Sequence, residues 1–341
     1  MDVSDYLIYP GDAVGVIILC LYNGVAKKIG LRKNGSTSES QYDPADITIL
    51  DFYGARFCGI DSSNKLEYKI ESGSAATFYI IGEFCGDAVI FDDPIDITES
   101  GNGWLDTDIT AHLNEGDSGN VALALVMGIT YKGRMGVREN GSTNELKDYW
   151  EQVPYFMITG VDSDDILEQY NNTNAYAIVT YYLVGYLPGS DVVWSTDIIN
   201  SYSITTPNTW TELDISGDIP ANAEGVIIIL DRGQTIMDMD AAVLRSKGSD
   251  NEESSDFIIL KHFFLLVFSP GNKGKIEYYT ENETANYDKV YVVGYLLNVI
   301  SRFTQTEGEI EELNKKFGSI EELNAKSGSI TELNKKGGSI A

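Results

Sequence analysis

The sequence has very few of the residues that carry metal-binding and acid–base chemistry. Its 341 residues include two histidines, His112 and His262, and three cysteines, Cys20, Cys58 and Cys85. Metal binding or acid–base catalysis by imidazole groups therefore has only two histidines available. The cysteines are odd in number and all lie near the start of the chain. We interpret them as buried free thiols, and not as a disulfide framework or a zinc site.

Sequence motifs of common catalytic sites are missing as well. The chain contains no P-loop, no G-x-G-x-x-G after a predicted strand, no G-x-S-x-G elbow and no H-E-x-x-H. Carboxylate pairs such as Asp92 and Asp93 occur, but among 52 acidic residues such neighbours are expected by chance. We therefore predict no enzyme activity, no catalytic or metal-binding residues and no cofactor.

Basic residues are scarce relative to acidic ones. The 24 lysines and arginines stand against 52 aspartates and glutamates, which gives a formal net charge of −28. Such a surface repels phosphate groups, so nucleic acids and anionic membranes are poor partners. The acidity fits solubility at high concentration, with cation binding or a salty habitat as alternative explanations.

Long apolar runs are absent too. No uninterrupted apolar stretch reaches the roughly 18–20 residues that span a bilayer. The first residues, M-D-V-S-D-Y-L-I-Y-P, have neither the basic n-region nor the apolar h-region of a signal peptide. We expect no membrane insertion and synthesis in a cytoplasm.

The chief positive feature is a threefold internal repeat. Arg32, Arg138 and Arg245 each follow an apolar run and are 106 and 107 residues apart. Their surroundings read I-G-L-R-K-N-G-S-T, M-G-V-R-E-N-G-S-T and A-V-L-R-S-K-G-S-D. A second signature follows each arginine: Y-I-I-G-E-F, Y-L-V-G-Y-L and Y-V-V-G-Y-L. A period this long indicates tandem whole domains, since solenoid units are roughly 20–50 residues. We place the repeats at 1–86, 87–190 and 191–296.

The pattern inside each repeat is typical of strands. Proline is scarce at 8 residues, whereas 21 tyrosines and 33 glycines suit an all-β chain. Short apolar segments alternate with turn signals, which predicts three tandem antiparallel β-sandwich domains of jelly-roll-like type. We expect the recurring arginine to pair with an acidic neighbour in each repeat. The N-G pairs after Arg32 and Arg138 predict type I′ turns.

The first repeat lacks its opening strands. It begins at D-V-S, which aligns with D-I-T in repeat two and D-I-S in repeat three, so it has no counterpart of the strands that carry Trp104 and Trp210. Residues 297–306 look like the opening strand of a further repeat. We predict that they are donated to repeat one, with Val299 and one of Ile300 or Phe303 in its core, and we favour donation between chains.

Residues 307–341 form a separate tail built on a ten-residue repeat. One interpretation is a series of short capped helical turns, another is a fibrous trimer stalk, and a third is a flexible linker. The spacing of its apolar residues predicts association between chains. The residues concerned are Ile310, Leu313, Ile320, Leu323, Ile330 and Leu333.

Aromatic residues in or beside the predicted loops of repeat two are the remaining hint of a ligand. Trp150, Tyr155, Tyr170 and Tyr176 are candidates for stacking on sugar rings, with packing at strand edges as the alternative.

The combination W-T-E-L-D-I-S, then G-V-R-x-N-G-S-T, then Y-L-V-G-Y-L resembles the jelly-roll modules of tail-fibre, head-fibre and decoration proteins of tailed viruses. The resemblance covers residues 2 to 306 and is best in repeat two. It implies a virion structural protein, located in the virion, that attaches to host-surface glycans or reinforces the shell. The implied partners are further copies of the chain, other virion proteins and host glycans. The alternative is a non-viral carbohydrate-binding adhesin array, which the missing secretion signal disfavours.

Overall fold

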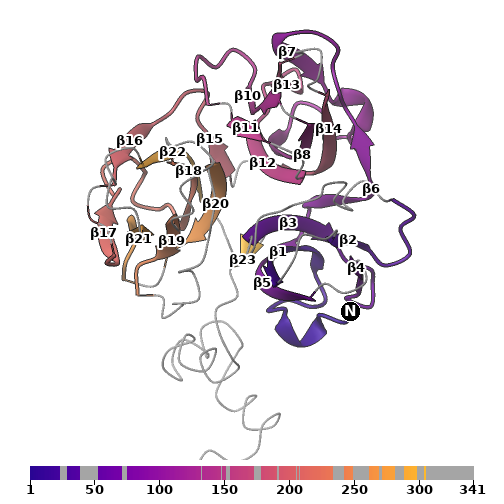
Figure 1. Ribbon diagram of the computed structural model, residues 1–341, viewed down its shortest axis with the longest axis horizontal. Coiled ribbons are helices and arrows are strands. Elements are labelled where there is room, and N and C mark those ends of the chain that lie inside the picture. The colour runs from indigo at the N-terminus through magenta and orange to yellow at the C-terminus, as the bar shows by residue number, and fades with distance from the viewer. Residues whose placement is uncertain are drawn as a thin grey trace, which may run out of the picture. The chain divides into compact units, whose positions relative to one another are not determined.

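The protein is described by a computed structural model (Figure 1). The described residues are 1–23, 29–38, 53–70, 75–131, 133–146, 148–150, 154–172, 178–189, 192–204, 206, 208–232, 242–248, 261–268, 271–280, 288–297 and 303–304. The chain divides into two compact units, Met1–Thr306 and Glu307–Ala341. The second unit, with all six apolar tail residues named above, lies outside the described residues.

The described part of the first unit is almost entirely β-structure, as predicted. Its only helical elements are two single 3-10 turns, η1 (Ser4–Tyr6) and η2 (Thr110–His112). All the strand pairs are antiparallel, and they build sheets that pack as sandwiches around apolar cores. No helix in the described part of the chain is long and apolar enough to cross a membrane.

Each of three modules has one large sheet with the same strand order. Modules one, two and three are defined here by these sheets and by the smaller sheets below. The large sheets are β23 (Phe303–Thr304), β5 (Ala75–Cys85), β1 (Ala13–Asn23) and β3 (Tyr53–Gly59) in module one; β6 (Val89–Asp96), β14 (Ile178–Pro188), β8 (Val121–Tyr131) and β12 (Pro154–Gly160) in module two; and β15 (Val192–Trp194), β22 (Asp288–Leu296), β18 (Gly225–Arg232) and β20 (Lys261–Val267) in module three, where β16 (Asn200–Ser203) also pairs with β22.

A smaller sheet completes each module, and here module one differs. Among the described residues, this sheet has three strands in modules two and three and two strands in module one. The strands are β10 (Val137–Glu139), β13 (Ile166–Asn171) and β7 (Gly103–Asp108) in module two; β19 (Ala242–Ser246), β21 (Lys275–Thr280) and β17 (Thr211–Asp214) in module three; and β2 (Ile29–Lys33) and β4 (Leu66–Ile70) in module one. Module two has in addition the pair β9 (Gly133–Met135) and β11 (Asp148–Trp150).

The central strands of the large sheets are apolar on both faces. In β8, Ala124 and Val126 lie in the core between the sheets, whereas Leu123, Leu125 and Met127 belong to a different cluster. Successive side chains of a strand point to opposite faces, so two buried faces require a continuous apolar run. This explains why each arginine motif follows an uninterrupted apolar segment and not an alternating one.

The outer faces of the three large sheets meet in one hydrophobic cluster, called here the shared cluster. Equivalent positions in the three central strands contribute Ile17, Leu125 and Ile227. Burying each such side chain stabilises the fold by about 1.5–3 kcal/mol. The modules are therefore packed on one another and are not independent beads. The buried members are Ile17, Phe57, Phe84, Ala88, Ile90, Leu123, Leu125, Met127, Phe156, Ile158, Val184, Leu187, Val192, Ile227, Ile229, Val293 and Leu296.

The opening strand of a large sheet is the first strand in each order given above. The three modules do not all obtain it from the same place in the sequence. In modules two and three it is supplied by the residues that begin the module, β6 and β15. In module one, β23 takes this place: Phe303 pairs with Phe84 and Thr304 with Glu83 (Figure 1). The pairing is within the chain, in contrast to the donation between chains that the sequence favoured. Val299 and Ile300 lie outside the described residues, and the structure describes only the backbone of Phe303.

Candidate functional site: the arginine clusters and the outer edge of module one

The recurring arginine pairs with a glutamate on the neighbouring strand in all three modules, which confirms that prediction. The Nε atoms of Arg32, Arg138 and Arg245 lie 2.7, 2.8 and 2.7 Å from carboxylate oxygens of Glu67, Glu168 and Glu277. The Arg138 guanidinium also donates to the carbonyl of Asn144 at 2.6 Å. The arginine thus ties two strands of the small sheet to the loop that follows.

A tryptophan covers the arginine in modules two and three. The guanidinium carbon of Arg138 lies 4.1 Å from the ring centroid of Trp104, and that of Arg245 lies 3.8 Å from the ring of Trp210. Both distances fall well within the range of a cation–π contact. The outermost strands β7 and β17 bring the two tryptophans to equivalent places, so the alignment of Trp104 with Trp210 is correct.

Module one has the arginine and the glutamate, but no such strand occurs among its described residues. At the beginning of β4, its outer edge pairs with the first residues of the chain. There the Met1 nitrogen donates to the Leu66 carbonyl at 2.7 Å, and the Leu66 nitrogen donates to the Met1 carbonyl at 3.0 Å. An isolated bridge joins Asp2 to Lys65. No described strand pairs with this edge from Glu67 to Ile70.

The exposure of Tyr68 differs from that of its equivalents in the other two modules. Tyr68 is 53% exposed, whereas the equivalent residues Gln169 and Tyr278 are 0% and 5% exposed. Tyr68 is one of the few large apolar side chains that are exposed in the described part of the chain. The sequence signal for this site is a tyrosine in a predicted strand of the repeat that carries the recurring arginine.

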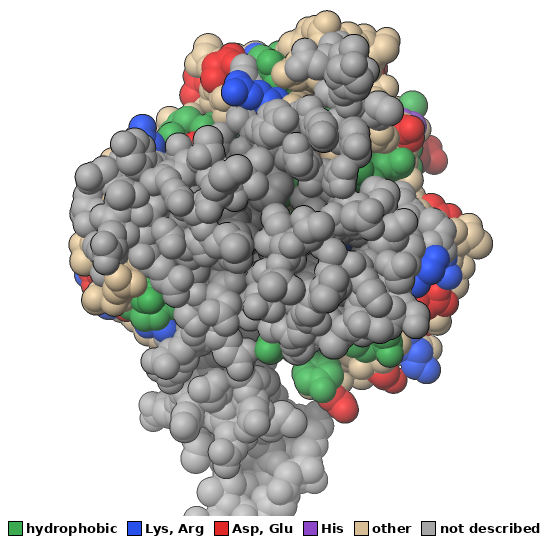
Figure 2. All heavy atoms as spheres, in the orientation of Figure 1, with side chains coloured by type: hydrophobic (Ala, Val, Ile, Leu, Met, Phe, Trp, Pro, Cys, Tyr) green, Lys and Arg blue, Asp and Glu red, His purple; other side chains and the backbone are tan. Residues whose placement is uncertain are grey.

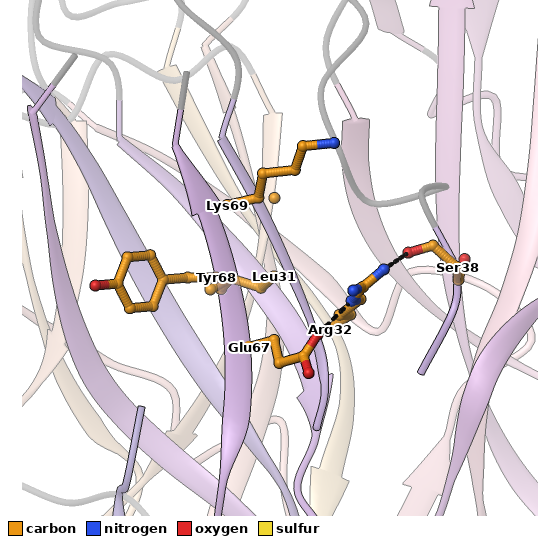
Figure 3. A pocket seen from close by; sticks show the side chains of 7 residues that line it. Leu31, Arg32, Ser38, Glu67, Tyr68 and Lys69 are labelled. Atoms are coloured by element: carbon orange, nitrogen blue, oxygen red, sulfur yellow. Dashed lines mark hydrogen bonds and ion pairs between the residues drawn. The ribbon is translucent and has the colours of Figure 1, made fainter. Parts of the chain in front are cut away.

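A pocket of about 190 Å³ lies on the outer face of this small sheet. It is lined by Gly30, Leu31, Arg32, Ser38, Glu67, Tyr68 and Lys69. Arg32 is joined to both Glu67 and the Ser38 carbonyl, while the Tyr68 ring points away from them on the other side of β4 (Figure 3). The hydrogen bond from Arg32 holds the pKa of Glu67 below its ordinary value, so this carboxylate stays charged at neutral pH.

The turns after the arginines are not of type I′, so this prediction was wrong. Gly35, Gly141 and Gly248 have φ of 86°, 80° and 82°, but Asn34 and Asn140 are absent from the positive-φ residues. A type I′ turn needs positive φ at both central positions, whereas a type II turn needs it only at the second. The asparagines act through their side chains instead, which donate to Asp61 at 2.6 Å and to Asp162 at 2.7 Å.

The same turns bind an aspartate of the next module. The Ser38 nitrogen donates to Asp93 at 3.1 Å, and the Ser36 hydroxyl also donates to Asp93. In the next pair of modules, the Thr143 nitrogen and hydroxyl both lie 2.9 Å from Asp197. The sequence alone did not indicate this link, although Asp93 lies within the opening strand β6 and Asp197 comes three residues after the opening strand β15.

Of the four aromatic residues proposed as sugar-stacking candidates, the structure describes the side chains of Tyr155 and Tyr170. Tyr155 is only 6% exposed and belongs to the sandwich core, which leaves its ring no surface for a sugar. Tyr170 is half-buried against Trp104, with ring centroids 5.3 Å apart. Trp150 of β11 pairs through its backbone with Gly133 of β9, and Tyr176 lies outside the described residues.

The cysteines match their interpretation. Cys20, Cys58 and Cys85 are free and buried, and burial raises the pKa of the Cys20 thiol to about 11. Among the described residues, no group of histidine, cysteine, aspartate and glutamate side chains is arranged to hold a metal ion. On the face drawn in Figure 2, acidic and basic side chains of the described residues are interspersed and do not gather into one patch.

Comparison with known proteins identifies no family for this chain. No family model matches the sequence, and no curated protein matches it. Among solved structures, the chain is similar to the STIV MCP, with a TM-score of 0.27 and 8% identity over 62% of this chain and 96% of that chain. That TM-score is too low to establish a shared fold, so the fold class rests on the strands and sheets described above.

Proposed function

We propose that the protein is a structural component of a virus particle, in which three joined sandwiches act as one building block. The shared cluster is the observation that carries this proposal. It buries Ile17, Leu125 and Ile227 from three modules together, and thereby makes a single rigid block from three repeats. Adhesin arrays that display binding modules on linkers have no need for such a cluster.

The links between turns and aspartates support the same role. Asp93 and Asp197 each join the opening segment of one module to the arginine turn of the module before it. Hydrogen bonds to a charged group are stronger than neutral ones, and here they fix the register of one module on the next. Rigidity of this kind suits a shell or fibre component whose contacts must repeat many times.

Within this role, shell reinforcement is favoured over attachment to glycans. Tyr155 is buried and Tyr170 is packed on Trp104, so two of the four candidate rings are already used in packing. A glycan array with the purified protein is therefore expected to show no specific binding. Specific binding to one glycan class would instead favour the attachment role or the adhesin alternative.

The direct test is the location of the protein. Particles purified from cultures that express the gene should contain the protein at a fixed ratio to the main shell protein, as measured by quantitative mass spectrometry. The ratio should survive washing in high salt, because the expected contacts are largely apolar. Recovery of the protein only in the soluble fraction, with none in particles, would contradict the proposal.

A further inference from the structure

Two joints connect neighbouring modules, and each is built on the turn that follows an arginine. In the first joint, between modules one and two, Asp93 accepts hydrogen bonds from Ser36 and Ser38. In the second joint, between modules two and three, Asp197 accepts them from Thr143. Because the two joints use the same turn and an equivalent aspartate, their charges can be compared position by position.

The first joint contains a lysine. Lys33 directly follows the arginine of module one and forms an ion pair with Asp92 of module two. The next residue, Asn34, donates a hydrogen bond to Asp61 at 2.6 Å. The ammonium of Lys33 thus supplies positive charge to a joint that also contains the carboxylates of Asp61, Asp92 and Asp93.

The second joint has a glutamate in place of that lysine. Glu139 directly follows the arginine of module two, and Thr196 stands where the first joint has Asp92. Asp162 and Asp197 are retained, and Asn140 donates to Asp162 at 2.7 Å as Asn34 does to Asp61. The lysine–aspartate ion pair of the first joint is therefore replaced by a glutamate and a threonine.

The carboxylate of Glu139 is poorly satisfied in this position. Its Oε2 atom is buried and has no hydrogen-bond partner. Burial raises the pKa of Glu139, and the hydrogen bond from Thr196 offsets part of that rise. The like charges of Asp162 and Asp197 raise the pKa further. A buried carboxylate oxygen without a donor favours the protonated form, because protonation removes the charge.

The cation nearest in sequence is already engaged. The Nε and Nη2 atoms of Arg138 donate to Glu168 on β13 at 2.8 and 3.1 Å, and its Nη1 atom donates to the Asn144 carbonyl. The strand β12 also packs against β10 and contains no charged residue. The titratable side chains on these strands, on the loop between them and on the opening segment of module three are Arg138, Glu168, Tyr155, Asp162, Asp164, Asp165 and Asp197.

We propose that Glu139 makes the second joint sensitive to protons: the protonated side chain tightens the contact between modules two and three, and the ionised side chain loosens it. A protonated carboxyl group has no charge and gains an O–H donor among carboxylate acceptors. An ionised group instead adds a third negative charge to those of Asp162 and Asp197. The proposal rests on the geometry of the joint and holds whether or not the chain is a virion protein.

The direction of the pH dependence follows from the raised folded-state pKa. Stability contributed by Glu139 is fully present below the ordinary glutamate pKa of about 4.3 and is lost as pH rises through the folded-state pKa. The carboxylate of Asp197 remains the acceptor across this range, because the hydrogen bonds from Thr143 lower its pKa. Acid should therefore tighten the second joint without breaking its main hydrogen bonds.

Thermal unfolding of the full chain between pH 4.5 and pH 8 tests the role of Glu139. Glu139→Gln keeps an acceptor for Thr196 and replaces the unpartnered oxygen by a donor. Over this range, the midpoint of the natural chain should fall by about 2 °C more than that of the variant. Glu115→Gln, the same change at an exposed glutamate of module two, should follow the natural chain. Identical pH curves for the natural chain and Glu139→Gln would overturn the proposal.

Hydrogen exchange followed by mass spectrometry places the effect at the joint and needs no change in the protein. The Thr143 amide donates across the second joint, and the Ser38 amide donates across the first. After correction for intrinsic exchange rates, the protection of Thr143 should fall at least threefold more than that of Ser38 between pH 5 and pH 8. An equal change at both amides would show that Glu139 does not control the second joint.

A reconstruction and a competing cation complete the test. The double variant Glu139→Lys with Thr196→Asp copies the Lys33–Asp92 pair, and should make the protection of Thr143 as insensitive to pH as that of Ser38. At pH 8 and constant ionic strength, 1 mM Mg²⁺, on the order of cellular concentrations, should shift the midpoints of the natural chain and Glu139→Gln equally. A larger rise for the natural chain would show that the joint takes a metal ion in place of a proton and would overturn the proposal.

Discussion

At the scale of single residues, the three arginines show how one ion pair acquires different energies. In module two, the side chains of Arg138 and Glu168 are both 11% exposed, and Trp104 covers the guanidinium. In module one, the side chains of Arg32 and Glu67 are 32% and 38% exposed. Water screens the second pair and is largely excluded from the first. The same residue types therefore contribute to stability in one module and much less in another.

Arg138→Met should lower the free energy of unfolding by about 3 kcal/mol, because it leaves the Glu168 carboxylate buried without its partner. Arg32→Met is the matched control and should cost about 1 kcal/mol or less. Urea denaturation followed by tryptophan fluorescence measures both changes. A double variant, Arg138→Met with Glu168→Met, should recover most of the loss. Equal losses for Arg138→Met and Arg32→Met would show that burial does not set the strength of the pair.

A second residue-scale prediction concerns Glu83, which is 0% exposed. Its carboxylate accepts hydrogen bonds from the nitrogens of Ile8 at 3.0 Å and Tyr9 at 2.9 Å. Burial raises the pKa of Glu83 above its ordinary value, and these bonds offset the rise only in part. Protonation is thus easier in the folded state than in the unfolded state.

Stability contributed by this group should therefore be lost as pH rises through the folded-state pKa, and be fully present below the ordinary glutamate pKa of about 4.3. Glu83→Gln should remove that pH dependence, although its single amide oxygen can accept only one of the two backbone hydrogen bonds from Ile8 and Tyr9. Thermal unfolding at intervals of about one pH unit between pH 4 and pH 8 measures this pH dependence of stability. Glu67→Gln is the control, because the Arg32 hydrogen bond lowers the pKa of Glu67 and gives a slope of opposite sign.

Residue roles could be predicted from the sequence where they recur. Arg32 and its two equivalents stand at a fixed place beside apolar strands, so a structural ion pair was foreseeable. Burial of Tyr155 was not foreseeable, because a strand buried on both faces shows no alternation that separates core from surface. The turns at Asn34 and Asn140 were mispredicted for a different reason. Those asparagines bond to aspartates of a distant hairpin, and local turn statistics contain no such partner.

At the scale of elements, the opening strand pairs with the equivalent strand in every module, but it does not always come from the start of that module. The signature glycines Gly185 and Gly294 lie so close to the carbonyls of Val89 and Val193 that a Cβ atom would collide with them. The sequence therefore encodes where an opening strand must lie, and the incomplete start of repeat one pointed to residues 297–306. It could not distinguish pairing within a chain from pairing between chains, since the same main-chain hydrogen bonds serve both.

A cysteine pair distinguishes these two arrangements. Glu83→Cys with Thr304→Cys places thiols on strand partners, whose Cα atoms are separated by about 4.5–5.5 Å, a distance that suits a disulfide. Oxidation should give an intrachain bond and a monomer on a denaturing gel without reductant. The natural cysteines are buried and should not interfere. A disulfide-linked dimer would show that the strand is exchanged between chains.

At the scale of the whole molecule, the tail remains a prediction from its sequence. Its apolar residues, ten apart, cannot be buried within a single short unit, so residues 307–341 are expected to drive association. Deleting them should lower the molar mass measured by light scattering from that of an oligomer to that of a monomer. A variant of equal length with serine at the six apolar positions is the control and should do the same. An unchanged mass in both variants would make the tail a passive linker.

The shared cluster leads to a further prediction, namely that the modules stabilise one another. Neighbouring residues of β18 provide a matched pair for this question. Ile227 and Ile228 are both 0% exposed, but Ile227 belongs to the shared cluster and Ile228 to the core of module three. Truncating either to alanine should cost about 2–5 kcal/mol through lost burial and the cavity left behind. The two changes differ in which modules lose contacts.

Scanning calorimetry should show one main transition for the natural chain, because unfolding one module exposes the apolar faces of the others. Ile228→Ala should lower the midpoint of that transition and leave it single. Ile227→Ala should instead split it, since module three loses contact with the block while its own core stays intact. The ratio of calorimetric to van't Hoff enthalpy measures the difference. If both variants keep a single transition with the same ratio, the shared cluster does not couple the modules, and the case for one rigid building block fails with it.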